Sequence, residues 1–239
     1  ELAKAIAATY FGDVANMVRL DMSEYQQPED VSRLLSNGAQ ESGSLIMAVR
    51  SQPFSVVLLD EIEKAHPNVL NLLLQMFDEG QLTDTAGKAV SFKDCIIIVT
   101  SNAGAQTIRD RVQQGQTLDS FQEEFTNELI DSGQFKPELL NRFDEIVLFG
   151  PLKPEELGRV VALMVTEINQ TLANQNITVE LTQDAVNKIV EVGYDPRLGA
   201  RPMRRTLQKA VEDTVAQKIL RNEILSGDHV ILDAPDLSI

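Results

Sequence analysis

The sequence predicts an α/β protein, with a mostly parallel sheet covered by helices on both faces, followed by a smaller, mainly helical domain. Two observations carry this prediction. Short apolar runs alternate with helical segments through the first part of the chain, and such alternation builds parallel sheets. After Pro151 and Pro154 the pattern becomes mainly helical. We therefore expect a core domain over residues 1–150 and a second domain over residues 151–239.

The core domain is expected to contain four strands and four helices. The run SVVLLD is continuous and apolar, which is typical of a strand buried on both faces. Pro67 and Gly80 bracket the clearest helix, because proline suits a first helical turn and glycine a helix end. The expected strands are Met17–Asp21, Ser55–Asp60, Cys95–Thr100 and Glu145–Phe149, and the expected helices are 1–10, Pro28–Leu35, Leu45–Arg50 and Pro67–Glu79.

The second domain begins near Gly150, where two prolines interrupt the chain. Its apolar periodicity predicts three helices and two short strands. The helices are expected at Pro154–Ala173, Thr182–Val192 and Ala200–Arg221, and the strands at Thr178–Leu181 and His229–Leu232.

Composition excludes several functional classes. The 36 acidic and 21 basic residues leave a net charge of −15, which argues against wholesale binding to nucleic acid or to an anionic membrane. A single cysteine rules out a disulfide framework, and with only two histidines a zinc site is not expected. No apolar stretch has the length of a membrane span, and no signal peptide opens the sequence. We expect a soluble, cytoplasmic protein.

Two adjacent carboxylates, Asp60 and Glu61, give the strongest chemical signal. They follow a buried strand, and open α/β sheets bind ligands at the carboxyl ends of their strands. Asp60 would hold Mg2+ through its water shell, and Glu61 would orient or deprotonate an attacking water. A strand that ends in solvated acids explains the pair about equally well when it is taken alone.

Three further residues are candidates, and two of them have a simpler alternative. Asn102 follows the next expected buried strand and could bind the same water or a γ-phosphate, although a turn residue is the simpler interpretation. Arg142 precedes the last strand of the core and could reach a neighbouring subunit's nucleotide, or it could be a solvated surface charge. Arg201 opens the last long helix, where the helix dipole disfavours a cation, so a phosphate partner is plausible.

Six stretches of the sequence form a specific set in this order: LDMSEY (20–25), VVLLDEIEKAHP (56–67), GQLTD (80–84), TSNAG (100–104), FKPELLNRFDEIV (135–147) and GYDPRLGARPMRR (193–205). Together they resemble the Clp/heat-shock AAA+ unfoldase family, specifically the second ATPase module of ClpB- and ClpC-type proteins. The resemblance implies an AAA+ core at 1–150 and a helical lid at 151–239. It also implies that Asp60 and Glu61 are the Walker B pair, Asn102 is sensor 1, Arg142 is the arginine finger and Arg201 is sensor 2.

By the same resemblance, the parent protein is an ATPase that uses Mg2+ and works as a hexameric ring. It would thread unfolded or aggregated proteins through a central pore, alone or with a ClpP-type protease or a co-chaperone. Neither nucleic acid nor membrane is expected as a partner. The loop Gln81–Ser91 resembles the family's second pore-facing hairpin.

The sequence departs from the family pattern in three places. The phosphate loop G-x-x-x-x-G-K-T that precedes the family's first helix is absent before Glu1, so we expect a sequence incomplete at its start and an inactive chain when taken alone. Ser36–Gln40 lacks the aromatic residue of the family's first pore loop. No Ile/Leu-Gly-Phe/Leu tripeptide for ClpP occurs between Ala105 and Gln134, which favours a disaggregase.

Two other functions remain open from the sequence. A degenerate, non-hydrolysing AAA+ scaffold or adaptor would explain the missing phosphate loop, but it would not need all five site residues. A clamp loader or replication ATPase would need a basic surface for DNA, which the net charge disfavours.

Overall fold

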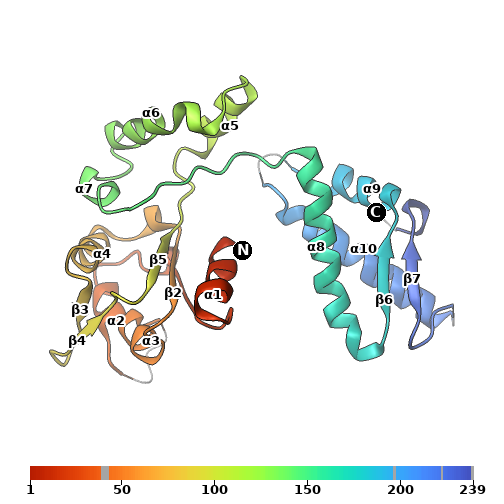
Figure 1. Ribbon diagram of the computed structural model, residues 1–239, viewed down its shortest axis with the longest axis horizontal. Helices are drawn as coiled ribbons and strands as arrows, with labels where there is room; N and C mark the ends of the chain where they lie inside the picture. Colours follow the sequence, from red (N-terminus) through yellow and green to blue (C-terminus); the bar gives the residue numbers. More distant parts are fainter. Residues whose placement is uncertain (39–42, 196–197, 222, 238–239) are drawn as a thin grey trace. The chain divides into compact units, whose positions relative to one another are not determined.

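The computed structural model describes residues 1–38, 43–195, 198–221 and 223–237. The chain divides into two compact units, Glu1–Phe149 and Gly150–Ile239 (Figure 1). Each unit has its own hydrophobic core. Among the described residues, no helix combines the length and apolar character that crossing a bilayer requires.

The first unit is built on a parallel sheet of three strands, β1 (Met17–Asp21), β2 (Val56–Asp60) and β5 (Ile96–Val99), in the order β1-β2-β5. Asp21 pairs with Asp60, and the residue before Asp60 pairs with Val99. All three strands therefore end at the same edge of the sheet. The predicted parallel sheet is confirmed.

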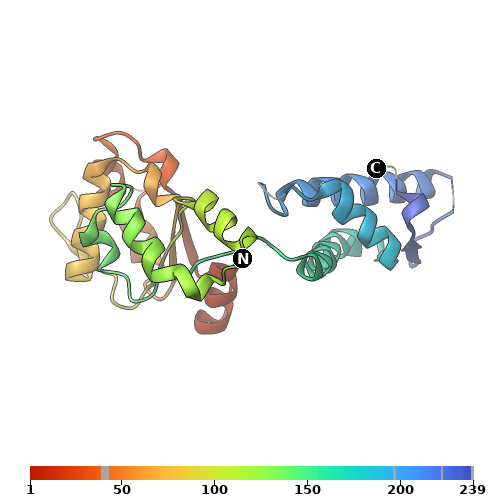
Figure 2. The same ribbon diagram turned by 90° about the horizontal axis from the view of Figure 1, so that it is seen from above.

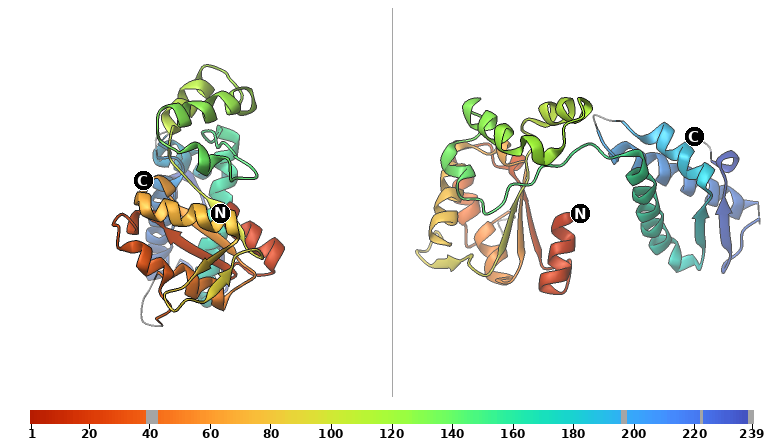
Figure 3. Two further views of the ribbon diagram at one scale, coloured as in Figure 1. Left: turned by 90° about the vertical axis from the view of Figure 1, so that its left-hand side faces the viewer. Right: turned by 45° about the horizontal axis from the view of Figure 1, so that its top comes forward.

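Helices cover both faces of this sheet (Figure 3). Val56 faces α1 (Leu2–Phe11), where it packs against Ala3 and Ala7. The next residue, Val57, points to the opposite face and enters the larger core, because side chains alternate along a strand. That core is closed by the remaining helices of this face, α2 (Asp30–Leu35), α3 (Leu45–Ser51) and α4 (Pro67–Glu79).

A short antiparallel hairpin and three helices complete the first unit. The hairpin β3 (Gln81–Thr83) and β4 (Ala89–Ser91) lies where the second pore-facing hairpin was expected. The helices α5 (Ala105–Gln113), α6 (Leu118–Asp131) and α7 (Pro137–Leu140) follow β5 (Figure 2). Ile108 of α5 shares a small hydrophobic cluster with Phe121 and Phe125 of α6. The unit also contains the short 3-10 helices η1 (Met22–Glu24) and η2 (Ile62–Lys64).

The predicted strand Glu145–Phe149 is wrong. Residues 145–149 have no strand structure, and within the described part of the chain no strand pairs with them. A strand needs a neighbour for its backbone N–H and C=O groups. Here the carbonyl of Ile146 instead accepts a hydrogen bond from the side chain of Gln122 at 2.7 Å, and Val147 and Phe149 are exposed.

The second unit packs three helices against a two-stranded parallel sheet. The prolines predicted to open it lie at 151 and 154, and Pro154 is the first residue of α8. A methyl group on Gly193 would come within 2.7 Å of Met203 Cα, so glycine permits α9 and α10 to pack closely. The elements are α8 (Pro154–Leu172), η3 (Ala173–Gln175), β6 (Thr178–Leu181), α9 (Gln183–Gly193), α10 (Arg201–Leu220), β7 (His229–Leu232) and η4 (Ala234–Asp236).

Candidate functional site

The carboxyl edge of the three-stranded sheet gathers polar side chains from every strand. Asp21 ends β1, Asp60 ends β2 and Glu61 follows it, while Thr100 and Asn102 follow β5. The strands are parallel, and their ends lie within one residue of each other in the pairing register. These side chains therefore meet at one edge of the sheet even though they are far apart in sequence.

Asp60 is held on both sides by neighbouring strands. The hydroxyl of Thr100 donates to Asp60 Oδ1 at 2.5 Å, and Arg19 Nη2 forms a salt bridge with Asp60 Oδ2 at 2.5 Å. A carboxylate offers about four lone-pair positions, so these two donors leave room for further partners. Asp60 is therefore oriented by the fold and still able to accept hydrogen bonds from the water shell of a metal ion.

Glu61 lies in a turn that its neighbours force into a left-handed conformation. Its φ and ψ are 57° and 53°, a region that costs a residue with a side chain about 1–2 kcal/mol. The next residue, Ile62, is only 1% exposed, and its backbone N–H donates to the carbonyl of Thr100 at 3.0 Å. Burial of Ile62 thus fixes the turn, while the Glu61 N–H donates to Thr100 Oγ1 at 3.2 Å.

Asn102 contacts the Glu61 carboxylate directly. Its Nδ2 donates to Glu61 Oε1 at 3.2 Å, and its backbone N–H donates to Glu63 Oε1 at 3.2 Å. Both acids belong to the turn after β2, so the loop after β5 is attached to that turn twice. A side-chain amide that donates to a carboxylate can hold it in one orientation for proton transfer from water.

Asp21 adds a further carboxylate to the edge. The hydroxyl of Ser23 donates to Asp21 Oδ1 at 2.6 Å, and the Ser23 backbone N–H donates to the same oxygen at 3.0 Å. These hydrogen bonds, led by the Ser23 hydroxyl, lower the pKa of Asp21 below its ordinary value because they favour the charged form. Asp21 therefore stays negatively charged beside its strand partner Asp60.

Arg142 lies outside this cluster, and Arg201 belongs to the second unit. Arg142 follows α7, and its Nε forms a salt bridge with Asp78 Oδ1 of α4 at 2.5 Å, with both side chains about half exposed. Arg201 is exposed and is the first residue of α10, in the second unit. Of the four predicted site residues in the first unit, the structure thus joins Asp60, Glu61 and Asn102. Of the segment Ser36–Gln40, residues 39 and 40 lie outside the described residues.

The cluster has the donor chemistry of a magnesium site. Carboxylate and hydroxyl oxygens are the ligands that Mg2+ prefers, and a nucleotide-bound Mg2+ is held through only one or two carboxylates, with water and phosphate supplying the rest. Asp60, with Thr100 beside it, fits that pattern. The described residues contain no group of three or more His, Cys, Asp or Glu side chains arranged to enclose a metal.

Comparison with known proteins identifies the family. A family model described as "AAA domain (Cdc48 subfamily)" matches residues 1–146, and one described as "C-terminal, D2-small domain, of ClpB protein" matches residues 152–232. The chain belongs to the Clp/ClpB-type AAA+ family. The predicted family and the predicted AAA+ fold, with its helical lid, are therefore confirmed.

Curated relatives of this Clp/ClpB-type chain align with nearly all of it. It is 43% identical to chaperone protein ClpB of Meiothermus ruber over 244 residues, covering 100% of this chain and 28% of that protein. It is 43% identical to chaperone protein ClpB of Aquifex aeolicus (strain VF5), covering 99% of this chain and 24% of that protein. It is 44% identical to the ATP-dependent Clp protease ATP-binding subunit ClpC of Staphylococcus aureus (strain USA300), covering 98% of this chain and 30% of that protein. The chain thus spans less than a third of the length of these relatives.

The sequence pointed to Asp60, Glu61 and Asn102, but it gave no role to Thr100, Arg19, Asp21 or Glu63. Thr100 is the last residue of the expected strand CIIIVT, and a polar residue in that position could have been noticed. Glu63 gave no usable signal, because its contact with Asn102 depends on how the turn after β2 folds.

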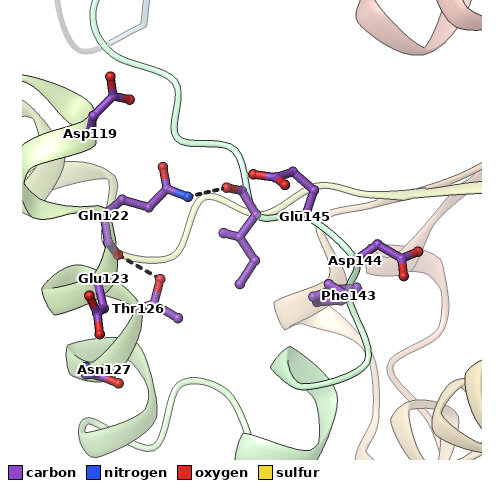
Figure 4. A pocket seen from close by; sticks show the side chains of 9 residues that line it. Asp119, Gln122, Glu123, Thr126, Asn127, Phe143, Asp144 and Glu145 are labelled. Carbon is purple, nitrogen blue, oxygen red and sulfur yellow. Dashed lines mark hydrogen bonds between the residues drawn. The ribbon is translucent and has the colours of Figure 1, made fainter.

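A depression in the first unit is lined by none of the residues of this cluster. It has a volume of about 580 Å³ and separates α6 from the segment after α7 (Figure 4). Its lining is rich in acidic side chains, and none of the five predicted site residues takes part in it. The lining residues are Asp119, Gln122, Glu123, Thr126, Asn127, Phe143, Asp144, Glu145 and Ile146.

Proposed function

We propose that this chain is the ATP-hydrolysing module of a Clp-type protein unfoldase or disaggregase. One observation carries the proposal: Asp60, Glu61 and Asn102 meet at the carboxyl edge of the sheet, and the Asn102 amide donates to Glu61. The relatives named chaperone protein ClpB and ClpC ATP-binding subunit support it. The activity, substrates and partners proposed here belong to the whole protein.

Each residue of the cluster has a distinct task in this proposal. Asp60 accepts hydrogen bonds from the water shell of Mg2+, which, when bound, neutralises charge on the phosphate oxygens. Glu61 accepts a proton from the attacking water or orients it. Asn102 keeps the Glu61 carboxylate turned toward that water. Thr100 holds Asp60 and the Glu61 backbone together, so the two acids keep a fixed relative position.

The two arginines act beyond the cluster. Arg142 is proposed to serve the nucleotide of a neighbouring subunit in a hexameric ring, where its charge stabilises the transferring phosphoryl group. For that role it exchanges its salt bridge with Asp78 for the neighbour's phosphate. Arg201 is proposed to sense the nucleotide from the helical lid (151–239), whose movement against the core (1–150) would transmit force.

The ring is proposed to act on unfolded or aggregated proteins in the cytoplasm. Threading through a central pore would use the hairpin β3–β4, whose turn is braced by a salt bridge of 2.6 Å between Arg50 and Asp84. A ClpP-type protease or a co-chaperone is a further proposed partner. We expect no role for nucleic acid or membranes, in line with the net charge of −15.

Substitution of Glu61 in the full-length protein tests the proposal. Glu61→Gln should leave ATP binding largely in place and slow hydrolysis by at least about 100-fold, because water activation is lost while Asp60 remains. Glu79→Gln is the matched control, since it removes the same charge from an exposed site on α4. Hydrolysis near the wild-type rate in Glu61→Gln would exclude the role of Glu61 and favour a non-hydrolysing scaffold.

A further inference from the structure

We propose that Glu63 is a positioning residue for ATP hydrolysis, which holds Asn102 in place so that Asn102 can orient Glu61. The inference rests on the function proposed for the cluster and adds a residue to it. Within the described part of the chain, Glu63 forms no hydrogen bond with the side chain of Glu61 or Asp60, so its effect passes through Asn102.

The contacts form a short relay. Glu63 Oε1 accepts the backbone N–H of Asn102 at 3.2 Å, and Asn102 Nδ2 donates to Glu61 Oε1 at 3.2 Å. The backbone bond fixes where the Asn102 Cα lies and how its side chain leaves the loop. The side-chain bond then reaches Glu61. Removing the first bond should therefore loosen the second.

The Asn102 backbone needs such a tie, because the remaining contact of its own peptide groups is local. Asn102 is exposed, and its carbonyl accepts the N–H of Ala105 at 3.2 Å, within the same loop. The loop is anchored farther on, at Gly104, where φ is +66° and a methyl group would come within 2.4 Å of the Phe125 ring. Between β5 and that anchor, Glu63 provides the bond from the Asn102 backbone to the turn after β2.

The second carboxylate oxygen of Glu63 is costly for folding, so a contribution to stability does not explain why a glutamate stands at this position. Glu63 Oε2 is buried and accepts no hydrogen bond within the described part of the chain. Buried polar atoms usually have a partner, because an unpaired one loses its hydration without compensation. A neutral glutamine could accept the Asn102 N–H equally well. The positioning role therefore needs the acceptor at Oε1 and does not need the charge. A substitution that keeps an acceptor should preserve the role, and one that removes the acceptor should abolish it.

Steady-state kinetics of the full-length protein test the proposal. Glu63→Met fills a similar volume without an acceptor, so it should lower kcat for ATP hydrolysis by about 10–100-fold, the range seen when a supporting hydrogen bond is lost, and leave KM within about 3-fold. Glu63→Gln should restore kcat to within about 3-fold of wild type because its side-chain oxygen still accepts. Lys64→Ala changes an exposed neighbour in the same turn and should have no effect.

Hydrogen exchange of the Asn102 backbone N–H gives a readout that does not depend on activity. In nucleotide-free full-length protein, this amide should exchange at least about 10-fold faster in Glu63→Met than in wild type, Glu63→Gln or Lys64→Ala. Unchanged exchange in Glu63→Met, or an equal loss of kcat in Glu63→Met and Glu63→Gln, would overturn the proposal. If wild-type protein hydrolysed no ATP, the proposed function would fail separately, while the exchange rates would still decide whether Glu63 holds Asn102.

Discussion

Each unit has a residue in the left-handed backbone conformation, but the two residue types differ in how well they tolerate it. In the described residues, Glu61 in the first unit and Asn176 in the second are the non-glycine residues with positive φ, at 57° and 55°. Asparagine tolerates this conformation because its short amide side chain can hydrogen-bond locally, whereas glutamate gains no such relief. The sequence of the second unit therefore agrees with its backbone at this point, and that of the first unit does not.

The threonines of the two units show the same contrast. Thr182 caps α9 by accepting the Ala185 N–H at 3.2 Å and also donates to Asp233, so both of its bonds join structural elements. Thr100 bonds Asp60 and the backbone of Glu61, the two acids of the proposed site. Polar side chains in the second unit complete the fold, whereas those at the sheet edge of the first unit hold one another in a particular geometry.

This difference predicts that substitutions at the sheet edge change catalysis and that substitutions in the second unit change stability. A residue can be costly for folding and still be present if its chemistry is required. The following substitutions are ordered by the size of their expected effect.

Arg142→Ala should have the largest effect, about a 1,000-fold loss of kcat in the full-length ring, because arginine fingers contribute on that scale. Folding and nucleotide binding should be preserved, since the salt bridge that Arg142 forms with Asp78 is half exposed and contributes little stability. Arg109→Ala is the control, as it removes the same charge from α5.

Mixed rings show whether Arg142 acts between subunits. A Glu61→Gln subunit still offers Arg142, and an Arg142→Ala subunit still offers Glu61, so rings of both should regain partial activity. Co-assembled rings without any recovery would make Arg142 a structural charge and would remove one functional residue from the first unit.

Thr100→Val should come next, with kcat lowered by about 10–100-fold because the two acids lose their shared hydroxyl partner. The variant keeps the side-chain shape, so thermal unfolding should shift little. A clear loss of stability with unchanged kcat would show that Thr100, like Thr182, has a structural role, and the difference proposed between the two units would be wrong.

Thr182→Ala should have a smaller effect, and it should change stability instead of catalysis. Losing the N-cap of α9 should cost about 1 kcal/mol of stability, which thermal unfolding of the full-length protein can detect. Hydrolysis per folded molecule, measured at a temperature well below the transition, should remain near the wild-type rate.

Local patterns in the sequence predicted much of the fold. The apolar run Val56–Leu59 predicted a buried strand, and Pro67 and Gly80 marked both ends of α4. The meeting of Asp60 and Asn102 followed from their positions after parallel strands. The helices α5 and α6 were not predicted, because few of their residues are buried; these are Ile108, Phe121 and Phe125.

Other features depend on contacts that local patterns do not contain. Residues 145–149 have the composition of a strand, but pairing requires a neighbouring strand, and the segment instead contacts Gln122 of α6. The roles of Thr100 and Glu63 depend on the left-handed turn at Glu61, which the burial of Ile62 imposes. Asp78, the partner of Arg142, lies on a different helix and has no sequence signature.

The central claim is that Glu61 is present for its chemistry although its backbone conformation is costly. Comparing Glu61→Asn with Glu61→Ala in the full-length protein tests it most directly, because both remove the carboxylate and only asparagine tolerates the left-handed conformation. Both variants should lose at least about 100-fold in hydrolysis. Glu61→Asn should be about 1 kcal/mol more stable than Glu61→Ala and therefore unfold at a higher temperature. If Glu61→Asn retained hydrolysis, or melted no higher than Glu61→Ala, the account would be contradicted.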